Sequence, residues 1–151
     1  MKLLSNVARY RALSRAERRL FVATAVLLAA CAAALRVAGF ARIRRWLTQL
    51  SRHRRVALDV APSRLANLVN AASTRLPVPC SCLTRSLVLD AMLRQRGVES
   101  DLRIGVRLVE GPLEAHAWIE VDGQPLNDSP AVTGQFAPFE GRVTARLPLV
   151  S

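Results

Sequence analysis

Three residues in the second half of the chain, Cys82, His116 and Asp128, are of the types that catalysis by a thiol nucleophile requires. A thiolate attacks a carbonyl carbon, an imidazole takes the proton of the thiol, and a carboxylate orients the imidazole. His116 is the only histidine after residue 53. We therefore expect acyl transfer through a thioester, with Cys82 as nucleophile, His116 as base and either Asp128 or its neighbour Asn127 as the orienting residue. This chemistry requires no cofactor.

Cys82 falls on the first turn of a predicted helix. Pro79 interrupts the preceding segment, Ser81 is a favourable N-cap, and Gly97 is a favourable residue just past the end. Apolar residues recur between them at helical spacing, at Leu83, Leu87, Val88, Ala91 and Met92. Unpaired backbone N–H groups and the positive end of the helix dipole favour a thiolate at such a helix start.

His116 lies on the second strand of a predicted hairpin. Apolar residues alternate over residues 102–108 and again over 115–121, and Asp122-Gly123 predicts a tight turn. The length of the turn decides which residue reaches His116. A two-residue loop brings Asn127 to its face of the sheet, whereas a three-residue loop with a glycine bulge brings Asp128 there.

Each cysteine also has a structural interpretation. A cysteine in a leucine-rich helix is commonly a small core residue, and this is the alternative for Cys82. Cys80 is a bystander or a competing nucleophile, and Cys31 is expected to pack in an apolar environment. A metal site is not expected, because Cys80, Cys82 and His116 offer at most three ligands at an unusual spacing for zinc. Three cysteines make no disulfide framework, which favours a reducing compartment.

The net charge of +11 divides the chain into two predicted segments. Residues 1–60 contain 13 Lys/Arg and two Asp/Glu, whereas residues 61–151 contain nine of each. We expect a basic helical segment over 1–60 and a catalytic core over 61–151. The basic segment favours an acidic partner or an anionic membrane surface. No nucleic-acid-binding motif is present in the sequence, so a nucleic acid partner is not expected.

The basic segment contains predicted helices. Ser14 is a favourable cap for a helix that continues through the uncharged run 20–35. A membrane-spanning helix needs about 20 apolar residues. We therefore expect a buried helix, with membrane association through residues 20–41 and a signal peptide as alternatives. A second, amphipathic helix is predicted around Ile43, Leu47 and Leu50, with a face of arginines at positions 42, 44, 45, 52, 54 and 55. Pro62 begins a third helix that ends near Arg75.

The run from Cys82 to Asp128 resembles the leader peptidase of lasso-peptide biosynthesis, the protease half of the split B protein. That family lies within the transglutaminase-like and papain-like cysteine proteases. The motifs that carry the resemblance are Cys82-Leu83-Thr84-Arg85-Ser86-Leu87, Arg96-Gly97-Val98, Ile104-Gly105-Val106-Arg107 and the run from Glu114 to Gly123. The resemblance is close over residues 60–130.

The resemblance implies an α+β fold: N-terminal helices, then a core in which the cysteine-bearing helix packs on a small antiparallel sheet. It implies a cytoplasmic cysteine peptidase that removes the leader from a lasso-peptide precursor. The implied partners are the precursor, a separate leader-recognition protein and the ATP-dependent lasso cyclase. It places the acid at Asp128 and therefore predicts the odd-length turn. Two alternatives remain: a transglutaminase-like acyltransferase with the same three residues, and a non-catalytic membrane or adaptor protein.

Overall fold

The computed structural model describes residues 14–53, 56, 60–108 and 111–138. In the described part of the chain, four helices precede the first strand and a short fifth helix lies between the last two strands, which confirms the predicted α+β class. The helices are α2 (Arg15–Ala38), α3 (Phe40–His53), α4 (Pro62–Ser73), α5 (Cys82–Arg94) and α6 (Val132–Gln135). The strands are β1 (Asp101–Leu108), β2 (Leu113–Val121), β3 (Gln124–Pro125) and β4 (Ala137–Pro138).

The first helices begin at the residues that the sequence indicates. Ser14 caps α2 through a capping box: its hydroxyl accepts from the N–H of Glu17 at 3.2 Å, and the Glu17 carboxylate accepts from the N–H of Ser14 at 2.9 Å. Pro62 is the first residue of α4, where its missing N–H costs nothing. Arg64 of α4 then bonds to Glu17, which joins the starts of the two helices.

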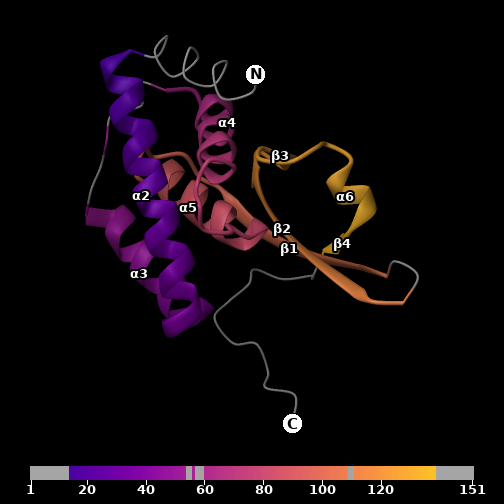
Figure 1. Ribbon diagram of the computed structural model, residues 1–151. Coiled ribbons are helices and arrows are strands. Elements are labelled where there is room, and N and C mark those ends of the chain that lie inside the picture. Colours follow the sequence, from indigo (N-terminus) through magenta and orange to yellow (C-terminus); the bar gives the residue numbers. More distant parts are fainter. Residues whose placement is uncertain (1–13, 54–55, 57–59, 109–110, 139–151) are drawn as a thin grey trace, which may run out of the picture.

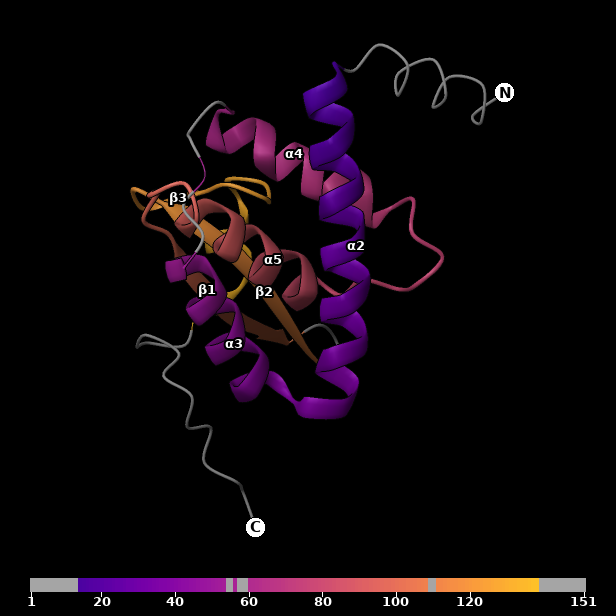
Figure 2. The same cartoon turned by 90° about the vertical axis from the view of Figure 1, so that its left-hand side faces the viewer.

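Helix α5 lies at the centre of the molecule. Helices α2, α3 and α4 contact it, and β2 with β1 packs against it as well (Figures 1 and 2). Every side chain from Ser86 to Leu93 is buried, which explains why α5 shows little amphipathic contrast. The core joins α5 to Leu28 of α2, Ile43 and Leu47 of α3, Leu65 and Val69 of α4, and Ile119 of β2. The cysteine-bearing helix therefore packs on the sheet, as predicted.

Residues from both predicted segments contribute to this one core. Leu28 and Ile43 lie before residue 60, and Leu65 and Val88 lie after it. The boundary at residues 60 and 61 remains a prediction.

Of the predicted basic face on α3, the side chains at positions 42, 44 and 45 are described. The Arg52 side chain and residues 54 and 55 lie outside the described part.

The sheet is antiparallel in the order β3-β2-β1-β4. Strand β2 pairs with β1 from Leu113 to Glu120, which is all of the strand except Val121. It pairs with β3 only at its end, where Val121 lies opposite Gln124. The loop between them is Asp122-Gly123 alone, so the predicted odd-length turn is wrong. Both turn residues have positive φ, 51° and 74°, as a two-residue turn that matches the strand twist requires.

Candidate active site

Cys82 is the first residue of α5. Its neighbour Ser81 is the N-cap, with a hydroxyl that accepts from the N–H of Thr84 at 3.2 Å. At the other end, the N–H of Val98 bonds to the Leu93 carbonyl at 3.1 Å, and Gly97 has a φ of +75°. This is a Schellman ending with Gly97 as its left-handed residue. The thiol of Cys82 is free and half-buried at the positive end of the helix.

The C-terminal end of α5 is attached to the start of β1. Arg94 donates to the Ser100 carbonyl at 2.8 Å, and the Ser100 hydroxyl donates to Asp90 at 2.7 Å. The next residue, Asp101, lies opposite Glu120 near the end of β2. The C-terminal end of α5 therefore lies beside the C-terminal end of β2.

A second contact fixes the direction of α5 along β2. The Ser86 hydroxyl donates to the Ala117 carbonyl at 3.0 Å. Cys82 lies four residues before Ser86, on the same side of the helix and one turn closer to its start. His116 lies one residue before Ala117 on the strand. Helix and strand run the same way, so the Cys82 end of α5 lies toward the His116 end of β2. The side chain of His116 packs with Trp118 and Phe136, on the face of β2 opposite to Ala117 and Ile119, and no hydrogen bond joins it to Cys82.

His116 and Asp128 are directly bonded. The distance from Nε2 of His116 to Oδ2 of Asp128 is 2.6 Å, and both side chains are partly shielded from solvent. The other carboxylate oxygen of Asp128 accepts from the N–H of Ser129 at 2.7 Å, which fixes the orientation of the carboxylate. An ionised carboxylate only accepts hydrogen bonds, so Nε2 carries the proton and Nδ1 is left to act as a base.

Asn127 explains how Asp128 reaches His116 across a two-residue turn. Leu126 still donates to the Ile119 carbonyl at 2.8 Å. The N–H of Ile119, however, donates to the side-chain Oδ1 of Asn127 at 2.8 Å and not to a main-chain carbonyl. The amide of Asn127 donates to the Ser86 hydroxyl at 3.1 Å, and its carbonyl accepts from Asn70 at 3.1 Å. Regular strand pairing stops at Asn127. The alternation of faces that would place Asn127, and not Asp128, beside His116 therefore does not extend to these residues.

Two aromatic rings pack next to the imidazole of His116. The ring of His116 lies 5.0 Å from that of Phe136 and 6.2 Å from that of Trp118, centroid to centroid. Trp118 is fully buried. Gly105 makes room for both, because a Cβ there would lie 2.9 Å from the Cβ of Phe136 and 3.0 Å from the indole of Trp118. The side-chain position of His116 is therefore set by packing as well as by Asp128.

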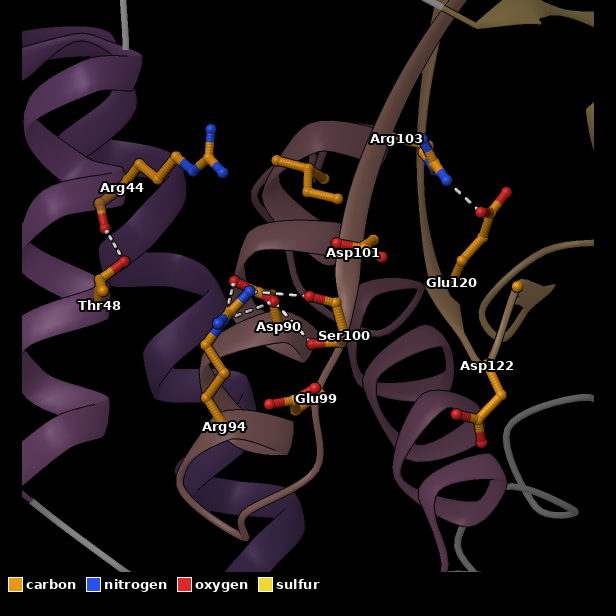
Figure 3. A pocket seen from close by; sticks show the side chains of 12 residues that line it. Arg44, Thr48, Asp90, Arg94, Glu99, Ser100, Asp101, Arg103, Glu120 and Asp122 are labelled. Atoms are coloured by element: carbon orange, nitrogen blue, oxygen red, sulfur yellow. Dashed lines mark hydrogen bonds and ion pairs between the residues drawn. The ribbon is translucent and has the colours of Figure 1, made fainter. Parts of the chain in front are cut away.

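Glu120 has a structural position. Its buried carboxylate accepts from the indole N–H of Trp118 and from Nε of Arg103, both at 2.9 Å. It lines a polar pocket of about 490 Å³ that also includes Asp90 and Arg94 (Figure 3). None of the three candidate catalytic residues lines that pocket. In this pocket Arg94 is paired with Asp90 and Arg103 with Glu120, whereas the dashed line at Arg44 joins its carbonyl to the Thr48 hydroxyl.

The three cysteines lie in different environments. Cys31 is buried in α2, and burial, together with the nearby thiol of Cys80, raises its pKa to about 11. Cys80 precedes α5, and its sulfur lies 3.6 Å from the Val78 carbonyl. Only Cys82 lies on a helix start. Among the described residues, no group of three or more His, Cys, Asp and Glu is arranged to hold a metal ion.

Two residues that position this site, Ser86 and Phe136, were not predicted from the sequence. Ser86 lies four positions after the candidate nucleophile, on the same side of the helix, and that spacing was the available signal. Phe136 had no comparable signal, because it lies between the four-residue α6 and the two-residue β4.

Residues 25–140 match the family described as the transglutaminase-like superfamily. The match covers most of the chain, so the protein belongs to that superfamily. The chain is also similar to the microcin J25-processing protein McjB of Escherichia coli, with 45% identity over 49 residues. That similarity covers 32% of this chain and 23% of McjB. No solved structure matches the chain.

Proposed function

We propose that the protein is a cysteine peptidase that removes the leader from a lasso-peptide precursor. The observation that carries this proposal is the bond between His116 and Asp128, at the end of β2 that lies toward the start of α5. Membership of the transglutaminase-like superfamily and the partial similarity to a microcin-processing protein support it.

The proposed reaction has two halves. Nδ1 of His116 takes the proton of the Cys82 thiol, and the thiolate attacks the carbonyl carbon of the last leader residue. The backbone N–H of Cys82 donates to the oxyanion that forms. His116 then returns the proton to the departing amine, and a thioester remains on Cys82. A water that gives its proton to His116 hydrolyses the thioester, which frees the leader carboxylate and the thiol.

Asp128 is assigned the role of orienting acid. It holds Nε2 of His116 at 2.6 Å, so the imidazole keeps the tautomer with an unprotonated Nδ1. Asn127, the other residue that the sequence allowed, is assigned a structural role, because its amide is bonded to Ile119 and Ser86. The mechanism uses no cofactor and no metal.

The partners follow from the same proposal. The substrate is the precursor peptide, a separate leader-recognition protein presents it, and the ATP-dependent lasso cyclase takes the freed core. Both the peptidase and these partners work in the cytoplasm. Activity of this chain should therefore depend on the leader-recognition protein, and specific cleavage at full rate without it would contradict that dependence.

The test is cleavage of a cognate precursor, followed by mass spectrometry. We expect Cys82→Ala and His116→Ala to abolish cleavage, and Asp128→Asn to lower kcat by about 10²–10⁴-fold. Cys80→Ala and Asp122→Asn are matched controls that should cleave normally. Cleavage by Cys82→Ala at the wild-type rate would refute the proposal.

The mass of the product separates the peptidase from the alternative acyltransferase. A peptidase releases a leader with a free carboxylate, whereas an acyltransferase joins the acyl group to an amine. A product that carries the mass of an added amine would replace the peptidase proposal with the transferase. A non-catalytic adaptor would yield neither product.

A further inference from the structure

The outward side of α2 is an apolar stripe. Val22, Val26, Ala30, Ala33 and Val37 are exposed, and Val26 and Val37 have exposed fractions of 64% and 90%. Their successive spacings of four, four, three and four residues place them along one side of the helix. The stripe is about 22 Å long from Val22 to Val37, at 1.5 Å per residue.

The opposite side of α2 is held in the protein core. Thr24, Leu28, Cys31 and Ala32 are buried, and the Thr24 hydroxyl lies 3.7 Å from the sulfur of Met92 on α5. In length and composition, α2 is a candidate for crossing a membrane. A helix that crosses must leave the core, however, whereas one that lies flat on a membrane keeps its buried side in place.

Basic residues flank the stripe at both ends. Arg15 and Arg19 are exposed on the first turns, and Arg36 is exposed on the last. The acidic residue of α2, Glu17, is bonded to Arg64 of α4 and so lies toward that helix. The outward side therefore has valine and alanine in the middle, arginines at the ends and no carboxylate.

Helix α3, which packs beside α2, also has an exposed apolar residue. Its buried residues Ile43 and Leu47 belong to the core with α5, whereas Trp46 is 49% exposed beside the exposed Arg42 and Arg45. Helices α2 and α3 lie next to each other on one side of the molecule, away from the sheet (Figures 1 and 2). A tryptophan flanked by arginines is typical of helices at a membrane interface.

We propose that this side of the protein, the outer face, binds the surface of an anionic lipid bilayer. The outer face is defined by Val22, Val26 and Val37 on α2, Trp46 on α3, and the flanking Arg15 and Arg36. The valines enter the boundary between headgroups and acyl chains, and the arginines extend to lipid phosphates. The concentration of the net charge in residues 1–60 favours an anionic surface over a neutral one. This inference is independent of the peptidase proposal.

The test uses the full chain and lipid vesicles without substrate. We expect the protein to sediment with vesicles of phosphatidylcholine and phosphatidylglycerol, far less with phosphatidylcholine alone, and less as salt increases. Val26→Glu should weaken binding by about tenfold, since burying a valine side chain is worth about that factor. Leu113→Glu is the control: Leu113 is also an exposed apolar residue, but it lies on the hairpin. It should bind like the wild type.

Fluorescence gives a second readout. The emission maximum of Trp46 should shift to shorter wavelength when the protein binds anionic vesicles. Trp46→Phe should remove this shift, because the other tryptophan, Trp118, is already buried. The inference is wrong if the wild-type protein does not bind anionic vesicles, or if it binds neutral vesicles as well as anionic ones. It is also wrong if Val26→Glu changes only the oligomeric state, which would assign the face to a second copy of the chain.

Discussion

Ser86 links the helix that carries the candidate nucleophile to the strand that carries the candidate base. Its hydroxyl is wholly buried, donates to the Ala117 carbonyl and accepts from the Asn127 amide. Ser86→Ala removes one hydroxyl and leaves both partners without it. A polar group left unpaired in the interior costs about 1–3 kcal/mol, so for the two partners together we expect a loss of about 2–6 kcal/mol in the free energy of unfolding. At about 2–4 °C per kcal/mol, the Tm falls by roughly 4–24 °C.

Urea unfolding measures the loss, and Ser63→Ala is the matched control. Ser63 is an exposed serine on the first turn of α4, so its substitution should change stability by less than about 0.5 kcal/mol. The double variant with Asn127→Ala tests the network. The two residues share a hydrogen bond, so the combined loss should fall short of the sum by about 0.5–3 kcal/mol. A Ser86→Ala protein as stable as the control, or strictly additive losses, would refute this reasoning.

Two further predictions concern the packing around the site. Gly105→Ala places a methyl 2.9 Å from the Cβ of Phe136 and should lower the free energy of unfolding by about 1–3 kcal/mol, whereas Gly134→Ala, with open space around it, should not. Equal urea midpoints for these two variants would contradict the close approach. Burial keeps Cys31 protonated to about pH 11 in the folded state, while in the unfolded chain it ionises near 9.0. Stability should therefore fall as pH rises from 9 to 11, by about 1.4 kcal/mol per unit, and Cys31→Ala should lack that part of the decline. Identical slopes in urea titrations of the two proteins would show that the thiol is not shielded.

Features fixed by a few neighbouring residues were predictable from the sequence. Ser14, Pro62 and Ser81 each begin a helix, and Gly97 ends one, because caps depend on local backbone geometry. The Asp122-Gly123 turn is equally local. The α+β class followed from the order of these elements and from the resemblance.

Features held by distant contacts were not predictable in the same way. The turn was expected to be odd in length, because regular pairing was assumed to continue to Asp128. Instead the side chain of Asn127 takes the place of a main-chain partner for Ile119, and the chain leaves the ladder. Phe136 lies between two elements that are too short to show a periodic pattern of apolar residues. Its place beside His116 depends on the space above Gly105.

The most direct test of the central claim is the rate at which iodoacetamide alkylates Cys82, followed by peptide mass mapping at neutral pH. We expect His116→Ala to slow alkylation of Cys82 strongly, because the thiolate loses its imidazole partner, while Cys80 in the same chain reacts at an unchanged rate. An unchanged Cys82 rate, or a loss of reactivity at Cys80 instead, would show that the sulfur of Cys82 and the imidazole of His116 do not act together.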